Sequence, residues 1–152
     1  MDKEYLCEAM LLGYKYFEDE CERLDQKVLR SALASRTKVT YKALDEIIRL
    51  NNEKIAIINA KVIIDEALEE LEHSQWLRAY YIDCTLSDTE SAKATTQNKV
   101  RLQREWLTKI IFKRHSTQEV YQIVADSEML LRKFKQCRGK NESDKNKPTK
   151  RN

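Results

Sequence analysis

The sequence has few of the residues that interrupt regular structure: two glycines and one proline among 152 residues, whereas 35% of the residues are charged. This composition disfavours turn-rich folds and is typical of long helices. Apolar residues recur at helical spacing, and no segment shows the alternation of a strand. The sequence therefore predicts an all-α protein, with a long N-terminal helical hairpin followed by a small helical unit.

Histidine is also scarce, and its scarcity limits the chemistry that the chain could perform. With two histidines and four widely separated cysteines, the sequence indicates no Ser/His/Asp or Cys/His catalytic group and no Cys-x-x-Cys metal or redox motif. Glu70-x-x-His73 has the spacing of a di-iron ligand pair but occurs only once, and two glycines leave no phosphate-binding loop. We therefore expect no enzymatic activity, no catalytic residue, no metal and no cofactor.

Long apolar runs are missing as well. No stretch approaches the roughly 20 apolar residues of a membrane-spanning helix, and the N-terminus is acidic from its start. We therefore expect a cytoplasmic protein with no membrane contact. Thiols stay reduced in that compartment, and we expect the four cysteines to be small buried side chains: Cys7, Cys21, Cys84 and Cys137.

Two amphipathic helices are predicted for the N-terminal half. The first covers about 3–30, and Thr40 is a candidate N-cap for a second that runs to about His73. The stripe of the second helix comprises Ala43, Ile47, Leu50, Lys54, Ile57, Lys61, Ile64, Leu68 and Leu71, with Ile48, Ile55, Ile58 and Val62 beside it. Because one helix cannot bury such a stripe alone, it must pair with the first helix, with a second copy of the chain, or with both. Residues 1–73 are thus predicted to form a long-helix hairpin, and 40–73 are a candidate homodimer interface.

The C-terminal half is predicted to be a compact helical unit over 74–137. It opens with an aromatic segment over 74–83, and the sequences Ser87-x-x-Glu90 and Ser116-x-x-Glu119 are capping boxes that begin two further helices. The second of these is predicted to be the last helix of the chain, with an apolar face of Val120, Ile123, Val124, Leu130, Leu131 and Phe134. After Cys137 the apolar residues end, so the composition predicts a disordered basic tail over 138–152.

Acidic and basic residues are segregated along the chain, although the net charge is only +3. Residues 62–90 contain eight acidic residues and one basic residue, whereas 91–114 contain seven basic residues and one acidic residue. The tail adds six basic residues against two acidic ones. The basic segments indicate either a polyanionic partner or pairing with the acidic segment of the same chain.

The segment LSDTESAKATTQNKVRLQREWL, residues 86–107, has the order of features of a helix-turn-helix motif. A capped helix over 87–94 precedes the polar sequence TTQN as the turn, and a second helix with an apolar inner face extends to about residue 113. The outward residues of that helix are of the types that contact DNA bases and phosphates: Gln97, Asn98, Lys99, Arg101 and Arg104. An ordinary solvated amphipathic helix would carry the same kind of face.

The same segment resembles a protein family. YYIDCTLSDTESAKATTQNKVRLQREWLTKI is similar to the fourth region of sigma factors, and especially to ArpU-type and sigma-like transcription regulators of phages of low-GC Gram-positive bacteria. In that family a helix ending YI(D/E)G precedes LS(D/E)xEIAxxLGxSxxxV and a basic helix. The signature positions are occupied here by Tyr81, Ile82, Asp83, Leu86, Ser87, Glu90, Ala92 and Val100. The Leu-Gly-x-Ser turn of the family is absent.

The resemblance implies binding to double-stranded DNA near a promoter, with RNA polymerase as a candidate partner, and no catalysis. It assigns base-reading positions to Gln97, Asn98, Arg101 and Arg104. The sequence therefore predicts a DNA-binding transcriptional regulator of phage or mobile-element type. The alternative is a helical protein-protein interaction module, an adaptor or inhibitor that does not bind DNA, because the long apolar stripe of the second helix needs a covering surface.

Overall fold

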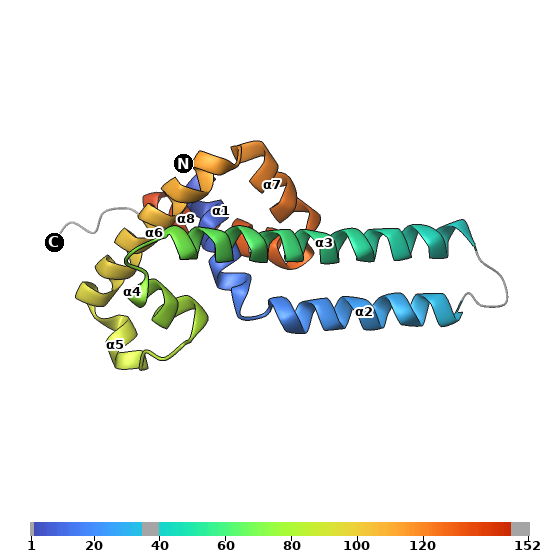
Figure 1. Ribbon diagram of the computed structural model, residues 1–152, viewed down its shortest axis with the longest axis horizontal. Helices are drawn as coiled ribbons and strands as arrows, with labels where there is room; N and C mark the ends of the chain where they lie inside the picture. Colours follow the sequence, from blue (N-terminus) through green and yellow to red (C-terminus); the bar gives the residue numbers. More distant parts are fainter. Residues whose placement is uncertain (1, 35–39, 147–152) are drawn as a thin grey trace.

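A computed structural model describes residues 2–34 and 40–146, with side chains described through residue 140. Every element in these ranges is helical, which confirms the all-α class (Figure 1). Within the same ranges, no helix has both the length and the apolar character needed to cross a membrane. The elements are α1 (Asp2–Tyr14), α2 (Phe17–Ala34), α3 (Tyr41–Glu70), α4 (Gln75–Leu77), the short π-helix η1 (Arg78–Ile82), α5 (Asp88–Ala92), α6 (Ala94–Arg114), α7 (Thr117–Asp126) and α8 (Glu128–Asn146).

The two long helices α2 and α3 form an antiparallel hairpin along the longest axis of the molecule (Figure 1). The predicted N-cap of α3 is confirmed, because the Thr40 hydroxyl accepts a hydrogen bond of 3.1 Å from the backbone N–H of Ala43. Leu24 of α2 and Ile57 of α3 are buried in the core. At the edge of the hairpin, Lys54 Nζ lies 2.7 Å from the Asp25 carboxylate and joins the two helices.

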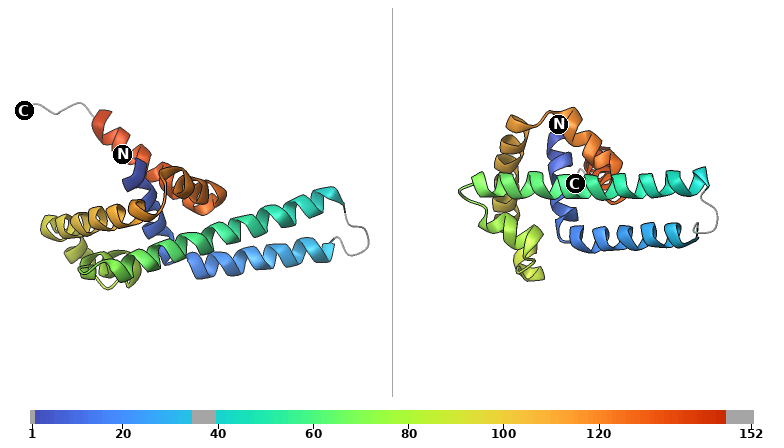
Figure 2. Two further views of the ribbon diagram at one scale, coloured as in Figure 1. Left: turned by 45° about the horizontal axis from the view of Figure 1, so that its top comes forward. Right: turned by 45° about the vertical axis from the view of Figure 1, so that its right-hand side comes forward.

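The predicted single helix over 3–30 is wrong, because the chain turns at residues 15 and 16. There α1 ends at Tyr14 and α2 begins at Phe17. In Figures 1 and 2, α1 runs across the hairpin rather than along it. The apolar side chains explain the separation. Helix α1 buries a broad apolar face between Leu6 and Gly13 and carries Glu4 and Glu8 on its remaining side, whereas α2 buries only Phe17 and Leu24. The fully buried side chains of α1 are Leu6, Cys7, Ala9, Met10 and Leu11.

The predicted hairpin over 1–73 is therefore too long: in the structure, the hairpin consists of α2 and α3 only. Helix α1 packs against α6, α7 and α8 from the C-terminal half as well as against α3. The buried side chains of both halves belong to one cluster, which includes Met10 of α1, Ile64 of α3 and Leu107 of α6. The predicted boundary at residue 73 does not separate two cores.

The C-terminal helices also differ from the prediction. The capping residue Ser116 is confirmed, since its hydroxyl accepts the Glu119 N–H at 3.1 Å, but α7 ends at Asp126. Buried Ser127 caps the next helix by accepting the Leu130 N–H at 3.2 Å. Because α8 then continues to Asn146, the predicted disordered tail is wrong for 138–146, and 147–152 lie outside the described residues. The segment 138–146 mixes good helix formers (Arg, Lys and Glu) with poor ones (Gly, Asn, Ser and Asp), and the helix extends through it because the packed first half of α8 supplies the nucleus.

Gly13 and Gly139 provide a matched test of the packing around α1. A Cβ added at Gly13 would lie 2.9 Å from Leu130 Cδ2 and 3.1 Å from Phe17 Cε1, whereas one added at Gly139 would meet nothing within 4 Å. We expect Gly13→Ala to lower the free energy of unfolding by about 1–2 kcal/mol through overpacking. Gly139→Ala should raise it by up to about 1 kcal/mol through helix propensity. Urea denaturation measures both, and stabilisation by Gly13→Ala would contradict this packing.

Candidate nucleic-acid interface

The junction of α5 and α6 is where the predicted helix-turn-helix lies. The cap is confirmed: the Ser87 hydroxyl accepts the Glu90 N–H at 3.1 Å, and α5 follows over Asp88–Ala92. The predicted turn is wrong, because TTQN forms the first turn of α6. The two helices are joined by the single residue Lys93, whose backbone is extended at φ −66° and ψ 134°. This joint is shorter than the three- or four-residue turn of DNA-binding helix-turn-helix motifs.

Side-chain contacts fix this short joint. The buried Thr96 hydroxyl donates a hydrogen bond of 2.9 Å to the Glu90 carboxylate, and Lys93 Nζ lies 2.9 Å from the same carboxylate. Together, Lys93 and Thr96 hold the pKa of Glu90 below its ordinary value. The Gln97 side-chain amide donates to the Ser91 carbonyl at 3.3 Å. The start of α6 therefore has a set position relative to α5.

The inner face of α6 attaches it to the core. Val100, Leu107 and Ile111 are buried as the sequence predicted. Gln103 is buried among them, and its side-chain oxygen accepts the backbone N–H of Leu77 at 2.8 Å. Sequence reasoning missed Gln103, because its partner lies 26 residues away and no local pattern indicates the contact.

Three of the predicted DNA-contacting residues, Gln97, Asn98 and Arg101, lie together on the exposed side of α6. They line a cleft of about 290 Å³ with Tyr80 of η1 and Lys140 of α8. Arg101 is 3.5 Å from Glu105, and its side chain is 60% exposed. We call these five residues the cleft face. Sequence reasoning missed Tyr80 and Lys140, which come from distant segments.

Lys99 lies apart from the cleft face. Its ammonium group is 4.4 Å from the centroid of the Trp76 ring, the separation of a cation–π contact. Trp76 belongs to α4, so this contact joins the start of α6 to the segment before η1.

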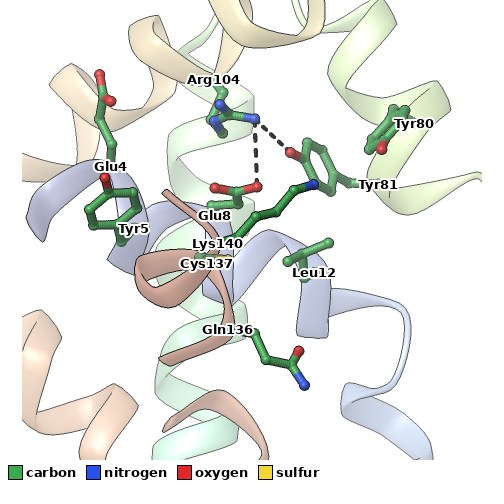
Figure 3. A pocket seen from close by; sticks show the side chains of 10 residues that line it. All are labelled: Glu4, Tyr5, Glu8, Leu12, Tyr80, Tyr81, Arg104, Gln136, Cys137 and Lys140. Atoms are coloured by element: carbon green, nitrogen blue, oxygen red, sulfur yellow. Dashed lines mark hydrogen bonds and ion pairs between the residues drawn. The ribbon is translucent and has the colours of Figure 1, made fainter. Parts of the chain in front are cut away.

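Arg104 also lines the cleft. Its guanidinium is bound by partners within the chain, as Figure 3 shows. It donates a hydrogen bond of 2.8 Å to the Tyr81 hydroxyl and lies 4.0 Å from the Glu8 carboxylate, with its side chain 21% exposed. Burial opposes the charge of Arg104, but Tyr81 and Glu8 outweigh burial and raise its pKa above the ordinary value. This geometry gives Arg104 a packing role, tying α1, η1 and α6 together.

A second cavity, of about 500 Å³, adjoins the cleft and is shown in Figure 3. It shares Glu8, Arg104 and Lys140 with the cleft and also contains Glu4 and Cys137. Burial, reinforced by Glu8, raises the pKa of the Cys137 thiol to about 12, so this thiol is neutral and a poor nucleophile near pH 7. Among the described residues, no group of three or more His, Cys, Asp or Glu side chains could hold a metal ion.

The predicted burial of the cysteines is confirmed for Cys7, holds only in part for Cys21 and Cys137, and is wrong for Cys84. Cys7 is fully buried, and burial raises the pKa of its thiol to about 12; Cys21 and Cys137 are partly buried. Cys84 is exposed, with φ at 52° in the left-handed region that favours glycine. It follows η1 at the position where the resembled motif YI(D/E)G has its glycine, so the backbone here has the conformation that a glycine would adopt most easily.

Comparison of the chain with protein-family models, curated proteins and solved structures found no match. The resemblance to sigma-like and ArpU-type regulators therefore stays a prediction based on the motif.

Arg104 and Arg101 differ in burial on the same helix, which makes them a matched pair. We expect Arg104→Ala to lower the free energy of unfolding by about 1–3 kcal/mol, because it leaves Tyr81 and Glu8 without their partner. Arg101→Ala should change it by less than about 0.5 kcal/mol. Urea denaturation followed by circular dichroism measures both variants. Equal effects would contradict the packing role of Arg104.

Proposed function

We propose that this protein binds double-stranded DNA through the cleft face and acts as a non-enzymatic transcriptional regulator of phage or mobile-element type. The observation that carries the proposal is the exposure of Gln97, Asn98 and Arg101 within the first eight residues of α6. The N-terminal part of a recognition helix is the part that reaches base edges in the major groove.

The side chains of the cleft face match the chemistry of DNA. Asparagine and glutamine can form paired hydrogen bonds with adenine, and arginine can do so with guanine. Lys140 supplies exposed positive charge for phosphates, and Lys93 at the joint is also exposed but pairs with Glu90. The first backbone N–H groups of α6 favour an anion at the same end of the helix.

The same geometry limits how much sequence information this surface could read. Arg104 is held by Tyr81 and Glu8, Lys99 contacts Trp76, and the Gln97 amide donates to the Ser91 carbonyl. Among the predicted DNA-contacting residues, Asn98 and Arg101 are exposed and have the side-chain groups most available for base contacts. We therefore expect phosphate contacts to supply most of the affinity. Binding should then fall steeply with salt concentration.

Mobility shift on a random-sequence duplex tests the proposal. The double variant Arg101→Ala/Lys140→Ala removes two exposed cations of the cleft face. We expect it to weaken binding at least about 10-fold at about 50 mM salt and to reduce the salt slope by about two. The matched control is Lys109→Ala/Lys113→Ala, which removes two exposed cations from the other end of α6.

The control should change the affinity less than about 3-fold, because those lysines lie outside the cleft face. Absence of binding by the wild-type protein at low salt would overturn the proposal. Equal loss in both double variants would also overturn it, because the charge of the whole chain, and not the cleft face, would then determine binding.

A helical protein-protein interaction module, an adaptor or inhibitor, is the second candidate function. The observation that favours it is the apolar surface along α3, where Ile48, Ile55 and Val62 are about half exposed. Contiguous apolar surface on a helix is typical of a protein interface. If the wild-type protein, with its apolar surface on α3 unchanged, binds no DNA at any salt concentration, the second candidate is favoured.

A further inference from the structure

Helix α3 carries two apolar stripes, and the fold covers only one of them. Leu50, Ile57 and Ile64 face the core and are at most 1% exposed. A second stripe lies between α2, beside which Ile58 and Val62 line one cavity, and the α7–α8 turn, beside which Ile48 lines another. Its apolar members are 45–54% exposed: Leu44, Ile48, Ile55, Ile58 and Val62.

The exposed stripe has the spacing of a coiled coil. Together with Asn51, the stripe contains six residues whose positions alternate in steps of four and three: Leu44, Ile48, Asn51, Ile55, Ile58 and Val62. In heptad positions, Ile48, Ile55 and Val62 occupy a, while Leu44, Asn51 and Ile58 occupy d. This seven-residue repeat is the pattern that keeps one face of a helix against another helix. The partner that fits the stripe is therefore a second helix of similar length.

The edges of the stripe carry different side chains. Lys54 and Lys61 lie along the g edge, next to α2, and each forms an ion pair of 2.7 Å within the chain, with Asp25 and Asp65. The other edge, at positions e, carries Asp45, Asn52, Asn59 and Glu66. A parallel pair of identical helices brings the g edge of one copy against the e edge of the other. Lys61 then faces Glu66 of the second copy.

An antiparallel pair would instead bring the lysine edges together, and the acidic edges together. Like charges in contact oppose that arrangement. Ile48, Ile55 and Val62 at the a positions are β-branched, and in a parallel coiled coil such residues favour two strands over three or four. Asn51 would meet Asn51 of the second copy, and a single polar pair in such a seam fixes the register.

We propose that α3 pairs with α3 of a second copy of this chain as a parallel two-stranded coiled coil along this stripe. The inference is independent of DNA binding. In Figure 1 the α5–α6 junction and the start of α3 lie at opposite ends of the molecule, and the stripe contains no residue of the cleft face. Pairing along the stripe leaves the cleft face open on both copies.

Sedimentation equilibrium of the full chain tests the pairing. We expect a monomer–dimer equilibrium with a dissociation constant of about 1–100 μM. Ile55→Lys places a charge at the centre of the stripe and should weaken the dimer at least about 100-fold. The matched control is Leu102→Lys, which changes an aliphatic side chain of α6 that is similarly exposed, at 45%, and should leave the dimer unchanged.

Both substituted side chains are exposed, so circular dichroism should show wild-type helix content in each variant. A monomer at about 200 μM wild-type protein would overturn the proposal, since that concentration exceeds the expected range. A dimer that persists in Ile55→Lys, or that is lost equally in Leu102→Lys, would also overturn it.

Cysteine cross-linking tests the parallel direction. Asn51→Cys in a Cys84→Ser background should form a disulfide-linked dimer on mild oxidation, because position 51 meets itself across a parallel seam. Asn59→Cys in the same background is the control, because position e lies beside the seam and should cross-link much more slowly. Cross-linking that is absent at position 51, or equal at both positions, would overturn the parallel arrangement.

Discussion

The burial of the broad apolar face of α1 is the constraint on which the rest of the structure depends. Leu6, Met10 and Leu11 are inaccessible to solvent, and the helix contacts α3, η1, α6, α7 and α8. Such a broad apolar face needs several neighbours to cover it, so the chain folds back around α1 from both halves of the sequence. From the same helix, Glu8 reaches Arg104 and helps to hold η1 against α6. The cleft face is thus built on the packing of the first helix.

Local signals in the sequence predicted local structure well. The caps at Thr40, Ser87 and Ser116 were correct because each hydrogen bond spans three residues and needs no tertiary context. The breaks after Tyr14 and Asp126 were missed because the apolar spacing continues across them. Such spacing indicates which side chains become buried, but it does not report whether the helix axis continues. The prediction of disorder over 138–146 was wrong for a different reason. A polar composition does not show whether a helix that begins in the core, such as α8, continues into that segment.

The candidate site was predicted only in part. The outward face of Gln97, Asn98 and Arg101 follows from helical spacing alone, and these residues are exposed in the structure. The binding of Arg104 to Tyr81 and Glu8 depends on tertiary packing across 23 and 96 residues of sequence. The difference in burial between the two stripes of α3 also depends on tertiary packing. Only the packed structure identifies the covered stripe and leaves the heptad of Ile48, Ile55 and Val62 as a surface for another helix.

Native-state hydrogen exchange in rising urea tests most directly whether α1 is the common core of the molecule. If it is, the amides of α1, α6 and the core half of α3 exchange through one opening whose free energy equals that of global unfolding. The cleft face would then exist only while α1 is in place. Exchange of the α1 amides at a clearly lower free energy, with α3 and α6 still protected, would contradict the account. The hairpin and the C-terminal helices would then hold together without α1.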